Sequence, residues 1–234
     1  MVETNGRNFD LLTLGQVLLR LSPPDNERLS RGDTFVKQVG GAELNVAVGA
    51  ALLGLHTGVI SKLPAHDIGS FMKGKIRSFG VSDDFFMYDQ SPAARVGIYY
   101  YENGAYPRKP KVIYDRNHSS FFSLDIDEIP EEVYTASKCF HTTGITLALN
   151  EDIRETTIEM IKRFKAAGTL VSFDVNFRGN LWTGDQAREC ILRILPYVDI
   201  FFCSEDTARL TFLKTGTARE MMKSFTEEFP ISID

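Results

Sequence analysis

Cysteine is scarce in this sequence, and it contains no basic cluster and no long apolar run. The three cysteines, Cys139, Cys190 and Cys203, are an odd number and include no C-x-x-C pair. This pattern argues against a disulfide framework and against a cysteine zinc site. We therefore expect three reduced cysteines in or near the core.

The charge balance argues against a nucleic-acid partner. Lysine and arginine number 26 against 31 acidic residues, which gives a net charge of −5, and the basic residues are scattered. A nucleic-acid-binding face would show as a basic stripe, so a small-molecule substrate is the better expectation. The first eight residues are polar and no apolar run approaches the roughly 18 residues of a membrane span. We expect a soluble, cytoplasmic protein.

The 234 residues, 43% hydrophobic and 24% charged, are enough for one large domain with a real core. Strand patterns alternate with helix patterns that end at glycines, which is typical of a parallel α/β sheet flanked by helices. The predicted strands are 9–15, 17–21, 34–39, 57–63, 95–102, 111–114, 138–142, 169–174 and 198–203. The predicted helices are 42–53, 68–79, 151–167, 184–195, 205–213 and 217–228.

Residues 95–123 interrupt this alternation. Two strand patterns flank a turn signal at 103–107, and tyrosines crowd the hairpin. We predict a small antiparallel lid beside the main sheet, with lid strands from about 16–39 and 95–123. Residues 230–234 read as the start of a further strand, so we expect residues 1–234 to be the N-terminal portion of a longer domain.

The first candidate for binding chemistry is Gly40-Gly41, at a strand-to-helix junction. Glycines there let backbone amides approach a ligand closely, and the helix start offers free N–H donors. Asn45, one turn into the helix, has an amide that can donate to and accept from a polyol. A tight turn with no ligand remains the alternative.

The pattern Gly40-Gly41-x-x-x-Asn45-x-Ala47 resembles the sugar-binding signature of the ribokinase (phosphofructokinase-B) family. Glu43-Leu44 and Pro64 depart from the usual form in the way that 2-keto-3-deoxygluconate kinases do. The stretches that also resemble that branch are Leu19–Pro24, Lys111–Arg116 and Asp174–Arg178, and the likeness runs from Phe9 to about Cys203. It implies a ribokinase-like Rossmann-type fold and ATP- and Mg²⁺-dependent phosphorylation of a sugar acid at its primary hydroxyl.

The resemblance also implies a substrate site. Tyr99, Tyr114, Arg116 and Arg178 would line it, with Gly41 and Asn45 holding sugar hydroxyls. A sugar acid carries a carboxylate, and the planar donor fork of arginine suits that group.

Simpler roles remain open for several of these residues. Arg116 would then pair with Asp115, and Arg178 with Asp174. Tyr100 and Tyr101 are expected to pack within the lid. His141 is expected to be a packed histidine after an apolar strand.

Parts of the family pattern are missing. No Gly-Ala-Gly-Asp motif is present, so we expect the catalytic base and the adenine site beyond residue 234 and expect this chain alone to be inactive. Ser204-Glu205 stand where the family usually has Asn-x-x-Glu, which makes them weak candidates for the nucleotide and its metal. Gln16 stands where an acidic residue is common.

Two other functions stay open. One is a fructokinase or another sugar kinase of the same family, although a neutral sugar gives no reason to bury cations. The other is a catalytically silent protein that binds a sugar acid. The tyrosine-rich lid is a candidate surface for a homodimer.

Overall fold

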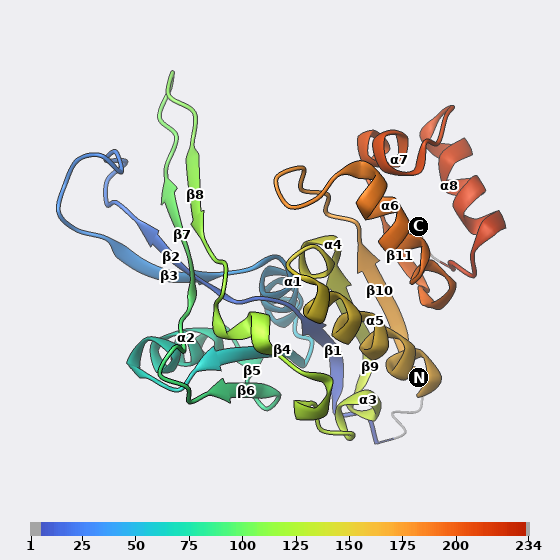
Figure 1. Ribbon diagram of the computed structural model, residues 1–234, viewed down its shortest axis with the longest axis horizontal. Coiled ribbons are helices and arrows are strands. Elements are labelled where there is room, and N and C mark those ends of the chain that lie inside the picture. Colours follow the sequence, from blue (N-terminus) through green and yellow to red (C-terminus); the bar gives the residue numbers. More distant parts are fainter. Residues whose placement is uncertain (1–5, 233–234) are drawn as a thin grey trace.

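The structure, a computed structural model, describes residues 6–232 and is built on a parallel seven-stranded sheet (Figure 1). Its strand order is β11-β10-β9-β1-β4-β5, and β6 also pairs with β4. The strands are β1 (Phe9–Leu14), β4 (Thr57–Pro64), β5 (Val81–Ser82), β6 (Phe86–Asp89), β9 (Ser137–Thr143), β10 (Leu170–Asp174) and β11 (Ile200–Phe202). All of these pairings are parallel, as the alternation of strands and helices predicts.

Helices cover both faces of this sheet. Val59 and Ile60, neighbours on β4, belong to two different buried clusters, because successive strand residues point to opposite faces. The cluster of Val59 includes residues of α1 (Ala42–Leu52) and α2 (Asp67–Ser78), and that of Ile60 includes residues of α5 (Glu151–Ala166) and α6 (Gly184–Leu192). The remaining helices are α3 (Val133–Ala136), α4 (Gly144–Leu147), α7 (Glu205–Phe212) and α8 (Ala218–Glu228).

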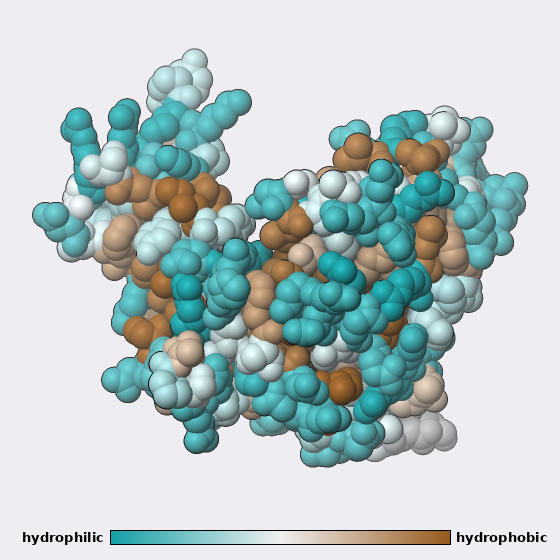
Figure 2. All heavy atoms as spheres, viewed as in Figure 1, coloured by the Kyte–Doolittle hydropathy of each residue, from teal (hydrophilic) through white to brown (hydrophobic). Residues whose placement is uncertain are grey.

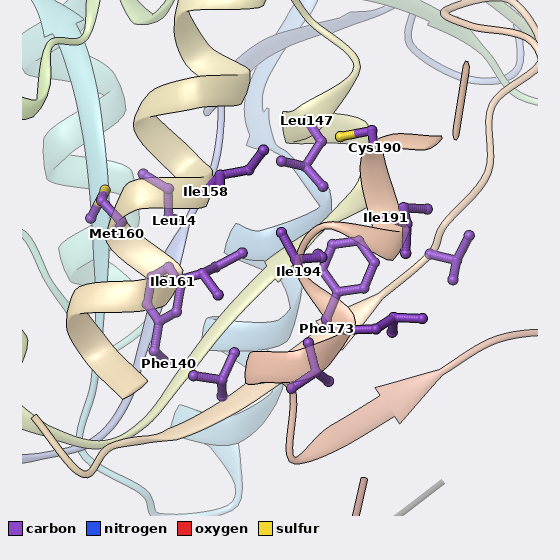
Figure 3. Close-up of a cluster of buried hydrophobic side chains, with 14 of the residues drawn as sticks. Leu14, Phe140, Leu147, Ile158, Met160, Ile161, Phe173, Cys190, Ile191 and Ile194 are labelled. Carbon is purple, nitrogen blue, oxygen red and sulfur yellow. The ribbon is translucent and has the colours of Figure 1, made fainter. Parts of the chain in front are cut away.

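Helix α5 shows how local signals set an element's ends. The Asn150 side chain accepts a hydrogen bond of 2.9 Å from the Ile153 amide, and two acidic residues occupy the first turn. Basic residues occupy the last turn, and Gly168 beyond it has φ 74°. The buried face of α5 packs on β9 and β10 around Phe140 and Phe173 (Figure 3).

A second sheet, the lid, stands out from one end of the main sheet (Figure 1). Its strands are β2 (Leu18–Ser22), β3 (Val36–Gly40), β7 (Gly97–Glu102) and β8 (Lys111–Asp115), in the order β3-β2-β7-β8. The outer pairs are antiparallel, which confirms the predicted hairpin of β7 and β8, but β2 and β7 are parallel, so the lid is a mixed sheet rather than a wholly antiparallel one. β2 and β7 both run outward, and β3 and β8 return beside them. Two outward strands that lie next to each other must be parallel.

Other predicted elements differ from the structure mainly at their ends. The helix predicted at 184–195 ends at Leu192 and is followed by a 3-10 turn at Leu195–Tyr197, where Pro196 cannot continue the ladder. The short strands β5 and β6 were not predicted, because two to four residues carry too little alternation. Residues 230–232 are not a strand, and 233–234 lie outside the described residues.

The cysteines and the membrane prediction can be compared directly. All three cysteines are free, as predicted; Cys190 is buried and the other two are half-buried. Between residues 6 and 232, no helix combines the length and apolar character that crossing a bilayer requires.

His141 lies in the middle of the sheet, as a packed histidine should. It is 4% exposed, its Nδ1 lies 2.9 Å from Ser172 Oγ, and its Nε2 has no partner among the described residues. Burial lowers the pKa of His141 from about 6.5 to about 4. The fold therefore holds the neutral imidazole.

We expect this histidine to make the protein acid-sensitive. Because its folded-state pKa is depressed, its contribution is complete above about pH 6.5 and is lost as the pH falls towards 4, by up to about 3 kcal/mol. Urea unfolding between pH 7.5 and 4.5 measures this slope. His141→Asn, which keeps a polar atom near Ser172 but does not titrate, should flatten it; an unchanged slope would assign the acid loss to other groups.

Candidate functional site

Two of the predicted arginines line one pocket at the base of the lid. The pocket has a volume of about 240 Å³. Its lining residues are Tyr114, Asp115, Arg116, Asn117, Ile145, Arg178, Asn180 and Leu181. Arg116 and Tyr114 come from the end of β8 and Arg178 from the loop after β10, so the pocket lies where the lid meets the carboxyl end of the main sheet. Figure 2 shows the surface hollowed between the lid and the body of the molecule.

Arg178 reaches the pocket through a sharp turn after β10. The Asp174 carboxylate accepts a hydrogen bond of 2.9 Å from the Asn176 amide, and Asn176 has φ 38°, in the left-handed region that asparagine tolerates. Asp174 forms no salt bridge with Arg178, whose side chain makes one protein hydrogen bond within residues 6–232, to the Phe177 carbonyl at 3.0 Å. The alternative of an Arg178–Asp174 ion pair is therefore not what the structure shows.

Arg116 likewise forms no salt bridge within residues 6–232. Asp115, the partner considered from the sequence, pairs with Arg95 at 2.8 Å instead. Arg116 Nε donates to Gln16 Oε1 at 2.8 Å, and the guanidinium lies 5.6 Å from the centre of the Tyr114 ring. Burial lowers the pKa of Arg116 from its usual value, and the nearby Glu43 opposes that change.

Tyr99 connects the pocket wall to the glycine turn. Its ring centre lies 6.0 Å from that of Tyr114, on the neighbouring lid strand. Its hydroxyl lies so close to Gly40 that a Cβ at Gly40 would come within 2.4 Å of it. Burial raises the pKa of Tyr99, so its hydroxyl stays protonated and can donate a hydrogen bond.

Gly41 and Asn45 sit at the start of α1, beside the pocket rather than in its lining. Gly41 has φ 148°, and a side chain there would come within 2.7 Å of the Gln16 carbonyl, so only glycine fits. The backbone N–H of Asn45 donates to the Gly41 carbonyl at 2.9 Å, and the Asn45 side chain is exposed. The structure thus brings Tyr114, Arg116 and Arg178 together, joins Tyr99 to them, and leaves Gly41 and Asn45 at the adjacent helix start.

Ser204 and Glu205 lie apart from this pocket. The Ser204 hydroxyl caps α7, accepting from the Thr207 amide at 3.3 Å, and Glu205 lies 3.5 Å from Arg209. Glu205 lines a separate, largely apolar pocket of about 200 Å³ between β11, α7 and α8. Between residues 6 and 232 no three His, Cys, Asp or Glu side chains converge on a possible metal position. Glu205, held by Arg209, is a poor magnesium ligand as it stands, and the described residues do not by themselves fit that metal.

The sequence pattern does not predict that the carboxyl group of Glu43 is buried beneath the site. Glu43, at the start of α1, is 2% exposed, and its Oε1 accepts hydrogen bonds from Thr143 at 2.6 Å and Thr146 at 2.8 Å. Burial raises the pKa of Glu43. The bonds tie the helix that follows the glycine turn to the carboxyl end of β9. About a hundred residues separate the partners, and only the order of strands in the sheet brings them together.

Comparison with known proteins identifies the family of the chain. Residues 8–229 match the pfkB family carbohydrate kinase. The chain is 35% identical over 220 residues to the 2-dehydro-3-deoxygalactonokinase of Haloferax volcanii, covering 94% of this chain and 68% of that protein. It is 30% identical over 207 residues to probable fructokinase-3 of Arabidopsis thaliana, covering 88% of this chain and 59% of that protein.

A solved structure has the same fold. The 2-dehydro-3-deoxygluconokinase of Thermotoga maritima superimposes with a TM-score of 0.85 at 32% identity, covering 94% of this chain and 68% of that one. The α/β fold with its mixed lid sheet is therefore ribokinase-like, as the resemblance implies. The chain belongs to the pfkB family of carbohydrate kinases.

Proposed function

We propose that the whole protein uses ATP to phosphorylate a 2-keto-3-deoxy sugar acid at its primary hydroxyl. The observation that carries this proposal is the pocket with two arginines from two different sheets, neither paired with an acid within residues 6–232. Guanidinium groups that form no salt bridge at one pocket favour an anionic ligand. Relatives whose names specify dehydro-deoxy sugar acids support the same substrate class.

Each predicted residue then has a distinct task. Arg116 and Arg178 hold the carboxylate through their donor forks. Tyr114 and Tyr99 form the wall and offer hydroxyl donors. Gly41 and Asn45, at the start of α1, hold sugar hydroxyls at the other end of the ligand. Together these contacts orient the sugar so that its primary hydroxyl faces the incoming phosphate.

The chemical step needs groups that this pocket lacks. Phosphoryl transfer requires a base for the acceptor hydroxyl and donors for the moving phosphate. We place the base, most of the ATP site and the magnesium ligands in parts of the whole protein beyond residue 234, with Ser204 and Glu205 contributing at most to the nucleotide side. On this proposal, residues 1–234 alone bind the sugar weakly and transfer no phosphate.

Fructose phosphorylation is the main alternative, since a fructokinase is among the relatives. The two guanidinium groups count against it, because a neutral sugar would give neither of them a salt-bridge partner. A sugar-acid-binding protein without kinase activity would bind the acid but show no turnover in the whole protein.

A panel of ATP-coupled assays on the whole protein tests the proposal. We expect a higher kcat/KM for 2-keto-3-deoxygluconate or 2-keto-3-deoxygalactonate than for fructose. Arg178→Ala should raise KM for the acid about tenfold or more, a loss of about 1.4 kcal/mol of binding, and leave fructose kinetics unchanged. Arg219→Ala on the exposed side of α8 is the matched control. Preference for fructose, with no loss in Arg178→Ala, would reject the proposed substrate.

We also propose that the lid forms a homodimer. Its exposed apolar side chains include Phe35, Val36, Val112 and Ile113, which one further copy of the lid would bury. Light scattering on the whole protein, with Ile113→Lys as a disrupting variant, would show a dimer that the variant dissociates; a monomer in both cases would reject it.

A further inference from the structure

Gln16 makes three hydrogen bonds at the base of the lid and is only 3% exposed. Its Oε1 accepts from Arg116 Nε at 2.8 Å, and its Nε2 donates to Ser119 Oγ at 2.6 Å and to the Arg116 carbonyl at 3.2 Å. The orientation of the amide follows from chemistry, since an arginine Nε can only donate and therefore requires the oxygen. One side chain thus grips both the side chain and the backbone of Arg116.

Gln16 lies where the main sheet meets the lid, so its hydrogen bonds to Arg116 form at the junction of the two sheets. Gln16 lies between β1 of the main sheet and β2 of the lid, whereas Arg116 follows β8. Gly97, the first residue of β7, allows the contact: a Cβ there would come within 2.7 Å of Gln16 Nε2 and 3.4 Å of Arg116 Cα. The backbone of the lid therefore packs directly on the pair.

The grip leaves the binding end of Arg116 available. Gln16 engages Nε, and within residues 6–232 neither terminal nitrogen of Arg116 donates to a protein acceptor. The hydrogen bond to Nε holds the Arg116 side chain in place while its two terminal nitrogens stay free. Less side-chain conformational entropy is then lost when a carboxylate binds. A guanidinium without this anchor would have several rotamers to lose on binding.

From these contacts we propose that Gln16 is a positioning residue for the sugar-acid pocket, which sets the affinity for the acid by holding the Arg116 fork in its binding orientation. This inference rests on the proposed function, because it takes Arg116 as the carboxylate contact. Gln16 acts through Arg116 and does not itself touch the reacting atoms.

Two substitutions in the whole protein distinguish the hydrogen bonds of Gln16 from the space that its side chain fills. Gln16→Met keeps the length of the side chain but removes all three hydrogen bonds, and should raise KM for 2-keto-3-deoxygluconate about tenfold while kcat changes less than about threefold. Gln16→Glu keeps an oxygen for Arg116 Nε, and the Ser119 hydroxyl can turn to donate to it, but it gives Arg116 an acidic partner that competes with the ligand carboxylate. It should therefore hold the Arg116 side chain in place and still raise KM for the acid. Gln90→Met, in an exposed loop, is the control.

A direct readout follows the Arg116 side chain itself. With ¹⁵N-labelled arginine, the Nε–H resonance of Arg116, assigned by its disappearance in Arg116→Met, should lose its protection from solvent exchange in Gln16→Met and keep it in Gln16→Glu. Unchanged KM and unchanged exchange in Gln16→Met would overturn the inference, as would an equal loss for acid and fructose. A wild-type protein that prefers fructose would instead reject the proposed function.

Discussion

Arg116→Met is expected to raise KM for a 2-keto-3-deoxy sugar acid about thirtyfold or more in the whole protein, with a much smaller change in kcat. Arg116 is the more buried of the two pocket arginines, so its contact with a carboxylate is the better shielded from water. Removing one partner of such a buried charged contact costs about 2 to 5 kcal/mol, and the lower figure corresponds to about thirtyfold. Steady-state kinetics over a range of acid concentrations measure the change.

Arg193→Met provides the matched comparison. Arg193 pairs with Glu155, 2.6 Å away and outside the sugar pocket, and both side chains are partly exposed. Loss of this exposed pair should cost at most about 1 kcal/mol and leave KM within about fivefold. Equal effects of the two substitutions, or an equal loss on fructose, would mean that Arg116 supports the lid rather than binding a carboxylate.

Phe140→Ala is expected to lower the free energy of unfolding by about 3 to 5 kcal/mol. Phe140 is fully buried in β9 (Figure 3). Its ring stacks on that of Phe164 of α5, with ring centres 4.1 Å apart. The substitution removes a large apolar surface and leaves a cavity between the central strand and its covering helix, where close packing limits collapse. Urea unfolding at pH 7.5, above the titration range of His141, measures the difference.

Leu52→Ala tests whether the loss depends on burial. Leu52 lies at the end of α1 and is 77% exposed, so its truncation should change stability by about 0.5 kcal/mol or less. A loss below about 1 kcal/mol for Phe140→Ala would contradict the packing described for the sheet and α5.

The main sheet was predictable because its signals are local. Several helices beside the sheet have a recognisable start and a glycine stop, as at Asn150 and Gly168 around α5. The parallel pairing of β7 with β2 could not be predicted, because neither segment carries a signal for which strand lies beside it. Pairing between residues 18–21 and 97–100 depends on the assembled sheets.

In the candidate site, too, some residues could be predicted from the sequence and others depend on the assembled fold. Resemblance to a family of sugar kinases pointed to Arg116 and Arg178, and the structure brings both to one pocket. The roles of Gln16 and Glu43, which are buried beneath the pocket, could not be predicted from the sequence. Gln16 reads only as a departure from an acidic position, and Glu43 as a departure from the usual signature. The roles of both depend on partners about a hundred residues away.

Arg116 belongs to the lid and Arg178 to the main sheet, although the two face one pocket. An anion that contacts both is a tether between the bodies, so its binding energy and the angle of the lid are thermodynamically linked. On the proposed function, the charge of the ligand, rather than its size alone, would then fix the lid against the main sheet.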